Sequence, residues 1–406
     1  QRRFPMKVSD RGRDAQASPI RRLAPHADEA VRSGAKVYYL NIGQPDLPTP
    51  DIVMDRIRQY PGKYVPYSPS AGIPEFQKGM AGYYAQHGLS VAPAEVLTTV
   101  GGSEALQFAF WSLFDPGDEV ILFEPYYTNY STMALLAGVT VKALTCDGRT
   151  GYHLPPLEAI ERAVGPKTRG ILICAPSNPT GTAYTAAEID GIVDLAKRKD
   201  LWIITDEAYR EFIYDGGTCE SPMTRKGAEE RTVLVDSISK RLNMCGARVG
   251  CLVTKNAGVR DACLKFAQAR LSPPTLGQYA AAVIDQVPAS YTQGVVAEFK
   301  KRRDLVLEGL AKIPGAFARK PEGAFYLMAE LPVPDAEEFV IWMLREYRKD
   351  NGTVMVAPGD GFYSTPGRGK NEIRFAYVLE TGALKAAMEI LAGALAEYPV
   401  KAVPKA

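Results

Sequence analysis

Short runs of apolar, often β-branched residues alternate with amphipathic stretches through the middle of this chain. One such stretch, residues 186–199, places Ile189, Ile192, Val193 and Ala196 on one helical face. Strands that alternate with helices favour a mostly parallel sheet covered by helices on both faces. The seven strands predicted from the apolar runs are residues 96–99, 119–123, 140–144, 170–174, 202–205, 233–236 and 249–253.

The pattern changes near residue 290. A long helix is predicted over residues 290–311, and strands at 324–330 and 372–378 belong to a second α+β region. We therefore predict an α/β protein in three parts. These are an N-terminal arm with part of a small domain in residues 1–51, a large domain around a seven-stranded sheet in 52–290, and a linking helix with the small domain in 291–406.

Composition and charge exclude several classes of function. The 406 residues carry a formal charge of only +2, which gives no support for nucleic-acid binding, so we expect the arginines at 11, 13, 21 and 22 to lie on a solvated arm. No apolar run approaches the length of a membrane span, and the first residues lack the apolar core of a signal peptide. Six scattered cysteines without metal-ligand spacing suit free thiols in a reducing cytosol. The expectation is a cytoplasmic protein without a metal, membrane or nucleic-acid partner.

Lys240 follows the strand predicted at 233–236, at the sheet edge where ligands bind in such folds. Ser237 and Ser239 lie beside it, and Arg248 comes eight residues later near two glycines. A lysine that forms a Schiff base needs lowered basicity and a fixed cofactor, and a guanidinium can hold a phosphate. Taken alone, Lys240 is better explained as a surface lysine, because most lysines lie on the surface.

Polar residues also follow other predicted strands. Asp206 could keep a pyridine nitrogen protonated or simply cap a helix. Asn178 lies in an Asn-Pro-Thr-Gly segment typical of a turn. Gly102 and Ser103 open a helix predicted over 103–114, and a helix N-terminus is a natural phosphate site. Arg374 interrupts an apolar strand and therefore needs an anionic partner, either a substrate carboxylate or an internal acid.

The ordered set of these motifs resembles the aspartate aminotransferase family, the fold-type I enzymes that depend on pyridoxal 5'-phosphate (PLP). The resemblance extends from the Asn-Ile-Gly-Gln-Pro-Asp motif at residues 41–46 to Arg374. It implies that Lys240 carries PLP through a Schiff base and moves the α-proton of the substrate, while Asp206 pairs with the pyridine nitrogen. The other implied cofactor contacts are Asn178 and Tyr209 at the ring oxygen, Tyr127 on the ring face, and Gly102, Ser103, Glu104, Ser237 and Arg248 at the phosphate.

The resemblance also implies how substrate and partner subunit are bound. Arg374 and the backbone of Gly43 would bind the α-carboxylate, next to Asn178, and no metal takes part. A homodimer with shared active sites would bring Tyr67 to the phosphate of the neighbouring subunit. Some relatives have a lysine at the position of Ser103 that binds the distal carboxylate, so Arg270 is a possible substitute here, although it could equally be structural.

We therefore expect an aminotransferase that moves an amino group between an L-amino acid, aspartate first, and a 2-oxo acid such as 2-oxoglutarate, with ping-pong kinetics. An aromatic amino acid or prephenate aminotransferase and a PLP-dependent β-lyase use the same cofactor residues and stay open. A PLP-sensing transcription regulator would need an additional DNA-binding domain, and about forty residues before Gly43 are too few for one with its linker. A cofactor-free binding protein of this fold would lack Lys240.

Overall fold

The computed structural model describes residues 6–400, and its central feature is a seven-stranded sheet in the order β2-β8-β7-β6-β5-β3-β4. Only β8 runs antiparallel to its neighbours, so the predicted mostly parallel sheet is confirmed. The strands are β2 (Val96–Thr99), β3 (Glu119–Glu124), β4 (Thr140–Thr145), β5 (Thr168–Cys174), β6 (Trp202–Asp206), β7 (Thr232–Ser237) and β8 (Gly250–Val253).

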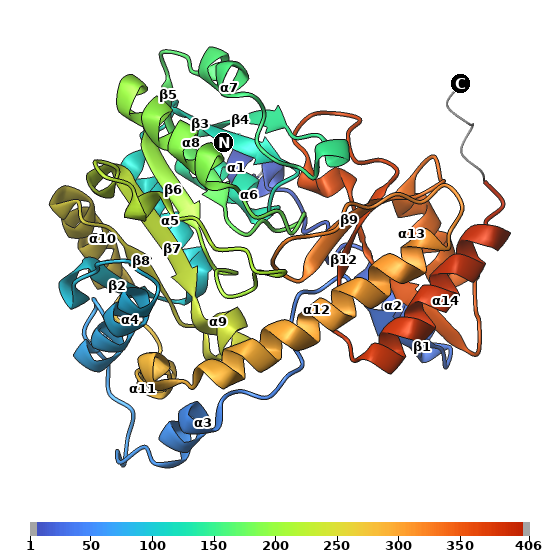
Figure 1. Ribbon diagram of the computed structural model, residues 1–406, viewed down its shortest axis with the longest axis horizontal. Helices are drawn as coiled ribbons and strands as arrows, with labels where there is room; N and C mark the ends of the chain where they lie inside the picture. The colour runs from blue at the N-terminus through green and yellow to red at the C-terminus, as the bar shows by residue number, and fades with distance from the viewer. Residues whose placement is uncertain (1–5, 401–406) are drawn as a thin grey trace, which may run out of the picture.

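Helices cover both faces of this sheet (Figure 1) because successive strand residues point to opposite sides. On β3, Val120 and Leu122 belong to one hydrophobic cluster, whereas Ile121 and Phe123 belong to another. The first face packs against α5 (Gly101–Leu113), α6 (Asn129–Ala137) and α10 (Ala257–Arg270). The second packs against α3 (Asp51–Arg58), α4 (Pro74–Gln86), α7 (Leu157–Ala163), α8 (Ala186–Lys199) and α11 (Thr275–Ala281).

Local chemistry fixes the ends of the predicted helix 186–199. Thr185 and Glu188 form a capping box at the start of α8, in which each side chain bonds a backbone N–H of the other. Asp200 ends the helix in the left-handed region at φ 52°. The predicted bounds of this helix are therefore confirmed.

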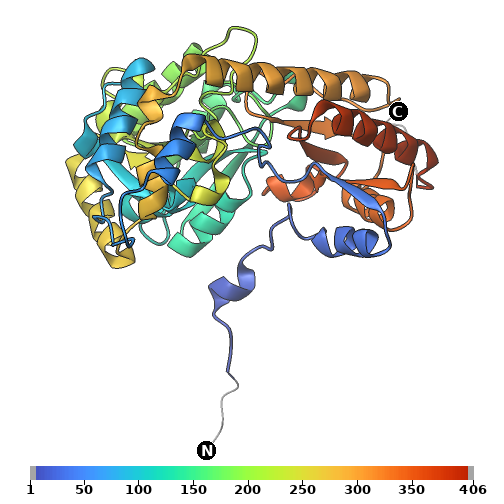
Figure 2. The ribbon, with the colours of Figure 1, turned by 90° about the horizontal axis from the view of Figure 1, so that it is seen from below.

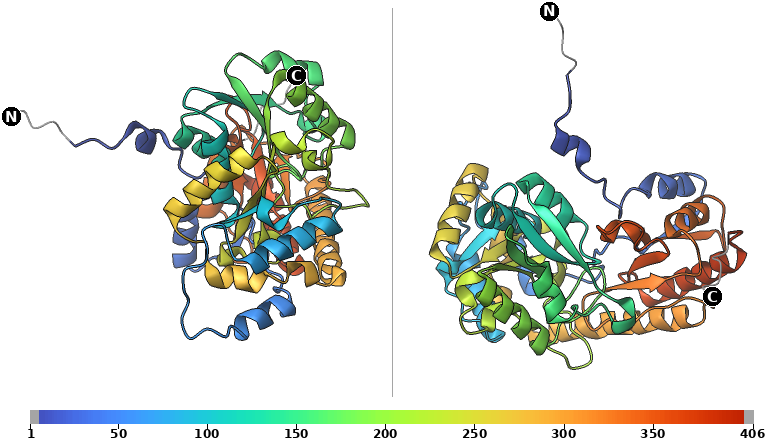
Figure 3. Two further views of the ribbon diagram at one scale, coloured as in Figure 1. Left: turned by 90° about the vertical axis from the view of Figure 1, so that its left-hand side faces the viewer. Right: turned by 90° about the horizontal axis from the view of Figure 1, so that it is seen from above.

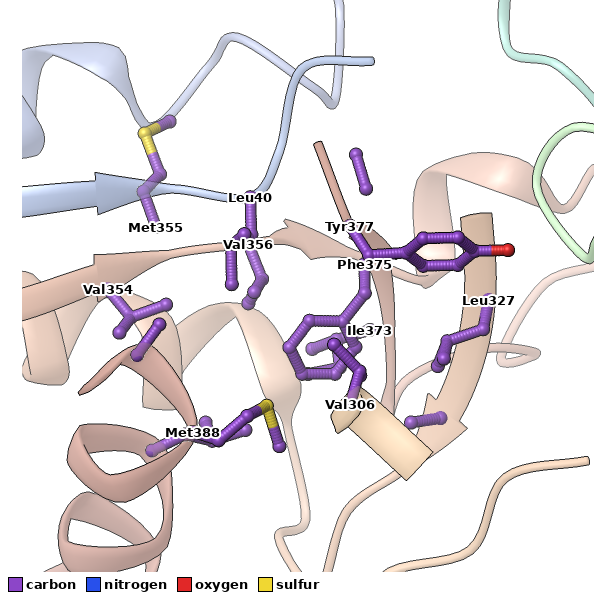
Figure 4. Close-up of a cluster of buried hydrophobic side chains, with 14 of the residues drawn as sticks. Leu40, Val306, Leu327, Val354, Met355, Val356, Ile373, Phe375, Tyr377 and Met388 are labelled. Carbon is purple, nitrogen blue, oxygen red and sulfur yellow. The ribbon is translucent and has the colours of Figure 1, made fainter. Parts of the chain in front are cut away.

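A second core lies around the C-terminal elements. Its sheet has the order β11-β12-β9 and is antiparallel, and a separate parallel pair joins β1 to β10. Figure 4 shows side chains from β9, β10, α12, β12 and α14 gathered in this core. The strands are β1 (Lys36–Tyr39), β9 (Tyr326–Glu330), β10 (Gly352–Met355), β11 (Ala357–Pro358) and β12 (Glu372–Ala376); the helices are α2 (Ala24–Arg32), α12 (Ala289–Ala311), α13 (Ala336–Arg345) and α14 (Thr381–Glu397).

The N-terminal segment joins this second core. β1 pairs with β10 across more than 300 residues of sequence, and Leu23, Ala27 and Leu40 are buried in the same cluster as the C-terminal helices. The short helix α1 (Asp10–Asp14) has no buried residue and stands away from the rest of the molecule (Figure 2 and Figure 3). Between residues 6 and 400, none of the helices combines the length and the apolar character that crossing a membrane requires.

Candidate active site

A cavity lies where the carboxyl ends of β5, β6 and β7 meet the first turn of α5. Cys174, Asp206 and Ser237 line it from the three strand ends, and Gly102 lines it from the helix. The second core closes it with Tyr326 and Arg374, and the N-terminal segment adds further residues. The cavity therefore stands at the topological position where open α/β sheets bind ligands.

Lys240 lies inside this cavity on the short helix α9 (Ile238–Arg241). Ser237 precedes that helix, and its side chain accepts a hydrogen bond from the backbone N–H of Ser239. The Nζ of Lys240 donates to the backbone oxygen of Gly43 at 2.6 Å and lies 3.6 Å from the Sγ of Cys245. The amine is thus aimed at the segment that the Asn-Ile-Gly motif forms.

One end of the cavity is built for an anion. Gly102 and Ser103 supply the first turn of α5, and the hydroxyls of Ser237 and Ser239 lie on the same lining. Arg248, itself at a left-handed φ of 53°, reaches back so closely that a Cβ on Gly101 would lie 2.5 Å from its Nη2. A helix N-terminus, two hydroxyls and a guanidinium together form a phosphate-binding set.

Asp206 ends β6 and is only 8% exposed. Its Oδ2 accepts from the hydroxyl of Tyr130 at 2.8 Å, and its Oδ1 accepts from the backbone N–H of Ala208 at 3.2 Å. Burial raises the pKa of this carboxyl to about 6, although both hydrogen bonds act in the opposite direction. No cation of the described chain forms an ion pair with Asp206, so a ligand with a positive charge would stabilise its carboxylate.

Arg374 lies on β12 and is 1% exposed. Its Nη1 donates to Oδ1 of Asn178 at 2.9 Å, and its Nη2 donates to the backbone oxygen of Asn41 at 2.5 Å. The Nε has no partner, and burial lowers the pKa of the guanidinium. No carboxylate within residues 6–400 pairs with Arg374, which excludes the internal acid that the sequence left open and favours an anionic ligand.

Four more of the expected residues line the same cavity. Tyr209 and Tyr326 share a hydrogen bond between their hydroxyls at 2.8 Å. Tyr127 is half-buried, and its hydroxyl accepts from Asn129 at 2.8 Å. A Cβ on Gly43 would lie 1.7 Å from the hydroxyl of Tyr326, so only glycine fits between Tyr326 and the cavity at that position. The fourth residue is Asn178, already described as a partner of Arg374.

Three expected residues do not line the cavity. The Nε of Arg270 pairs with Oε1 of Glu104 at 3.2 Å, and its Nη2 donates to the backbone oxygen of Thr98. Glu104 also accepts from the backbone N–H of Val100, which leaves only its own backbone for a ligand at the helix terminus. Tyr67 is 83% exposed and lies outside the cavity. The geometry therefore favours the structural reading of Arg270.

The arm is the part of the site that the sequence did not reveal. Ile20 and Arg21 line the cavity, and Arg22 forms ion pairs with Glu337 at 2.5 Å and Asp360 at 2.7 Å. The expectation of a solvated arm is therefore wrong for Arg22, which is half-buried and pairs with two carboxylates. Arg21 is exposed, as expected, although it also borders the cavity. The apolar Pro19 and Leu23 on either side of them, both buried, were the available signal. Tyr130, Cys245 and Tyr326 are further lining residues that were not expected.

All six cysteines are free thiols, four of them buried and two half-buried, as expected. In the part of the chain that the structure describes, no three His, Cys, Asp or Glu side chains are grouped so as to hold a metal ion.

Comparison with known proteins adds the family to this geometry. The family "Aminotransferase class I and II" matches residues 35–391. The aspartate/prephenate aminotransferase of Thermus thermophilus is 32% identical over 374 residues, which are 90% of this chain and 93% of that protein. The solved structure of aspartate aminotransferase from Thermus thermophilus with maleate has a TM-score of 0.86 at 30% identity. The solved structure of alanine aminotransferase from Pyrococcus furiosus has a TM-score of 0.88 at 27% identity. Each comparison covers 96% of this chain and all of the other chain. The chain therefore belongs to the class I and II aminotransferase family.

Proposed function

We propose that this aminotransferase uses PLP to move an amino group between a dicarboxylic L-amino acid, aspartate first, and a 2-oxo acid such as 2-oxoglutarate. The observation that carries the proposal is the pairing of two features in one cavity. Arg374 is a buried cation that pairs with no carboxylate of residues 6–400, and Lys240 directs its amine into the same space. A substrate carboxylate bound by Arg374 would bring the α-carbon of an amino acid close to that amine.

The residues of the cavity fit PLP. The first turn of α5, the hydroxyl of Ser237 and the guanidinium of Arg248 would hold its phosphate. Asp206, buried and without a cation, would hold the ring nitrogen in its protonated form. Asn178 and Tyr209 would bond the ring oxygen, and Tyr127 would lie on the ring face. When bound there, PLP supplies an electron sink for the electrons left on the α-carbon after its proton departs.

The protein's own groups would then orient the substrate and move the proton. Arg374 and the backbone at Gly43 hold the α-carboxylate, which fixes the direction of the α-proton. The amine of Lys240 would take this proton at Nζ and give it up again within the same cavity. Amino acid and 2-oxo acid use this cavity in turn, so ping-pong kinetics follow.

Prephenate is the second candidate acceptor. It occurs in the name of the Thermus thermophilus relative, and like aspartate it carries two carboxylates. The cavity favours such substrates because its lining holds four cationic side chains, those of Arg21, Lys240, Arg248 and Arg374, against the single carboxylate of Asp206. A monocarboxylic amino acid would leave more of this positive charge unmatched.

We also propose a homodimer in which Tyr67 completes the site of the partner subunit. Residues 65–67 and 272–275 line one shallow hollow together with Val100, which directly precedes the glycines of α5. The hydroxyl of Thr275 holds this surface together by donating to the backbone oxygen of Pro66 at 2.9 Å. Val65 and Tyr67 are largely exposed there, and exposed apolar surface of this kind is typical of an interface.

The free cysteines support a cytoplasmic location, because thiols stay reduced in the cytosol.

The proposed function is tested by adding PLP to the purified protein. We expect a visible absorption band from the lysine-bound cofactor that disappears on addition of aspartate and returns with 2-oxoglutarate. Borohydride reduction followed by peptide mass mapping should place the cofactor on Lys240, and Lys240→Ala should show neither band nor labelled peptide. A labelled lysine elsewhere, or a band that no amino acid removes, would contradict the proposal.

A further inference from the structure

Arg21 is a third arginine of the cavity, and neither the phosphate end nor Arg374 explains it. It comes from the N-terminal segment, on the side of the cavity formed with Ile20, Ile42 and Gly43. No carboxylate of residues 6–400 forms an ion pair with it, in contrast to its neighbour Arg22. A guanidinium at the opening of a binding cavity, without an acid beside it, is available to a ligand.

The backbone that carries Arg21 is fixed on both sides. The Nδ2 of Asn41 donates to the backbone oxygen of Ile20 at 2.8 Å, and the ion pairs of Arg22 hold the other side. Leu23 is buried in the second core, and a Cβ on Gly361 would lie 2.2 Å from the Cβ of Pro19, so this prolyl ring packs tightly. Arg21 is therefore presented to the cavity by an anchored turn, although it lies in an arm.

Arg21 and Arg374 border the same part of the cavity. Asn41 bonds both neighbourhoods, because its side chain holds Ile20 while its backbone oxygen accepts from Arg374. Burial raises the pKa of Tyr127 to about 12, and the positive charges of Arg374 and Arg21 both act against this rise. Each guanidinium is thus close enough to influence one and the same tyrosine hydroxyl.

The cations can be matched to the anionic groups that the proposed reaction brings. PLP carries a phosphate, and a dicarboxylic amino acid carries an α-carboxylate and a distal carboxylate. Arg248 and Arg374 account for the phosphate and the α-carboxylate. We propose that Arg21 binds the distal carboxylate, so that the N-terminal segment determines the preference for dicarboxylic substrates. This inference rests on the proposed function and gives Arg21 the task that Arg270, paired with Glu104, does not perform.

The test compares Arg21→Gln and Arg21→Lys with the control Arg11→Gln, whose arginine is exposed on α1. Loss of one charge-assisted contact should lower kcat/KM for aspartate by about 10- to 100-fold in Arg21→Gln while alanine changes less than about threefold. Arg21→Lys should keep part of the preference, and Arg11→Gln should keep all of it. Calorimetry on the PLP-loaded protein should show weaker binding of succinate, but not of butyrate, in Arg21→Gln.

Other outcomes overturn the inference and are distinguishable from failure of the proposed function. An equal loss for aspartate and alanine would make Arg21 a structural residue, and a loss confined to phenylalanine would assign it to an aromatic ring. Unchanged aspartate turnover and succinate binding in Arg21→Gln would remove it from the site, with the aminotransferase proposal intact. A wild-type protein that turns over no amino acid refutes the proposed function, while succinate binding still decides the role of Arg21.

Discussion

Replacing Asp206 by asparagine should make the cofactor-free protein more stable at neutral pH, although it should weaken PLP binding. Asp206 is buried and pairs with no cation in the described part of the chain, so its negative charge is held in a poorly solvating environment. Asparagine keeps the shape and removes the charge. The carboxylate accepts from both the hydroxyl of Tyr130 and the backbone N–H of Ala208, and the single oxygen of an amide keeps only one of these two bonds.

The magnitude follows from the pKa of this carboxyl, which burial raises from 3.8 to about 6. The pKa of Asp206 is higher in the folded protein than in the unfolded one. The contribution of this carboxyl to the free energy of unfolding is therefore fully present below pH 3.8 and is lost as the pH rises through 6. A shift of about two pKa units corresponds to roughly 3 kcal/mol. Loss of the bond to Tyr130 offsets about 1 kcal/mol of this gain. The net advantage of Asp206→Asn should therefore grow from about 0.5 kcal/mol at pH 5 to about 2 kcal/mol at pH 8.

The assay is urea unfolding of the cofactor-free protein from pH 5 to pH 8, at equal protomer concentration because a dimer adds a concentration dependence. Asp261→Asn is the matched control, since Asp261 is exposed on α10 and the chemical change is the same. This control should show no advantage that depends on pH. With saturating PLP the order should reverse, because only the carboxylate can pair with a protonated ring nitrogen.

Two results would refute this reasoning. If Asp206→Asn were no more stable than the wild type at pH 8, the buried charge would not destabilise the cofactor-free protein. If its advantage were the same at pH 5 and pH 8, the effect would not come from ionisation of Asp206.

Three further predictions follow from the same geometry. Arg374→Gln should lower kcat/KM for aspartate and alanine alike by about 10²- to 10⁴-fold, because two charge-assisted hydrogen bonds to the α-carboxylate, of roughly 1.5–3 kcal/mol each, are lost. A loss limited to aspartate would contradict the assignment of Arg374 to the α-carboxylate. Tyr67→Ala and Lys240→Ala, each inactive alone, should regain activity when mixed, because one site of the hybrid dimer then has both residues; continued inactivity of a verified hybrid would argue against shared sites. Arg22→Gln should raise KM for aspartate more than for alanine by freeing the turn that carries Arg21, whereas unchanged KM values would show that the two ion pairs are not needed there.

The fold could be predicted because its strands are continuous apolar runs and its helices are amphipathic. The predicted and observed bounds of the elements differ where backbone conformation, and not the apolar pattern, determines where an element begins. α5 begins at Gly101, two residues before the predicted start at 103. Glycine disfavours a helix in sequence-based prediction, but at Gly101 the missing side chain leaves room for Arg248. β9 begins at Tyr326 and not at 324, because Ala324 adopts a left-handed φ of 52° and its N–H bonds Phe212.

The centre of the site was predictable for a topological reason. Lys240, Asp206 and Asn178 each follow a predicted strand, and the ends of parallel strands meet at one sheet edge. Contacts over long sequence distances leave no comparable pattern. Nothing local indicates that Arg270 pairs with Glu104, 166 residues earlier, or that Arg21 reaches the cavity. Single arginines on either side of a site are therefore the residues that sequence alone assigns least well.

The cavity keeps two opposite charges apart, and this separation favours a catalytic role. Asp206 and Arg374 both line one cavity, yet they do not pair with each other, and each is bonded only by neutral groups. A cavity arranged for stability alone would join them or replace both by apolar residues, because an uncompensated buried charge is strongly destabilising. Keeping them apart leaves an acceptor for a cationic ring nitrogen on one side and a donor for a carboxylate on the other. With Lys240 between the β7 end and Gly43, the cavity matches a cofactor and a substrate together better than it matches either alone.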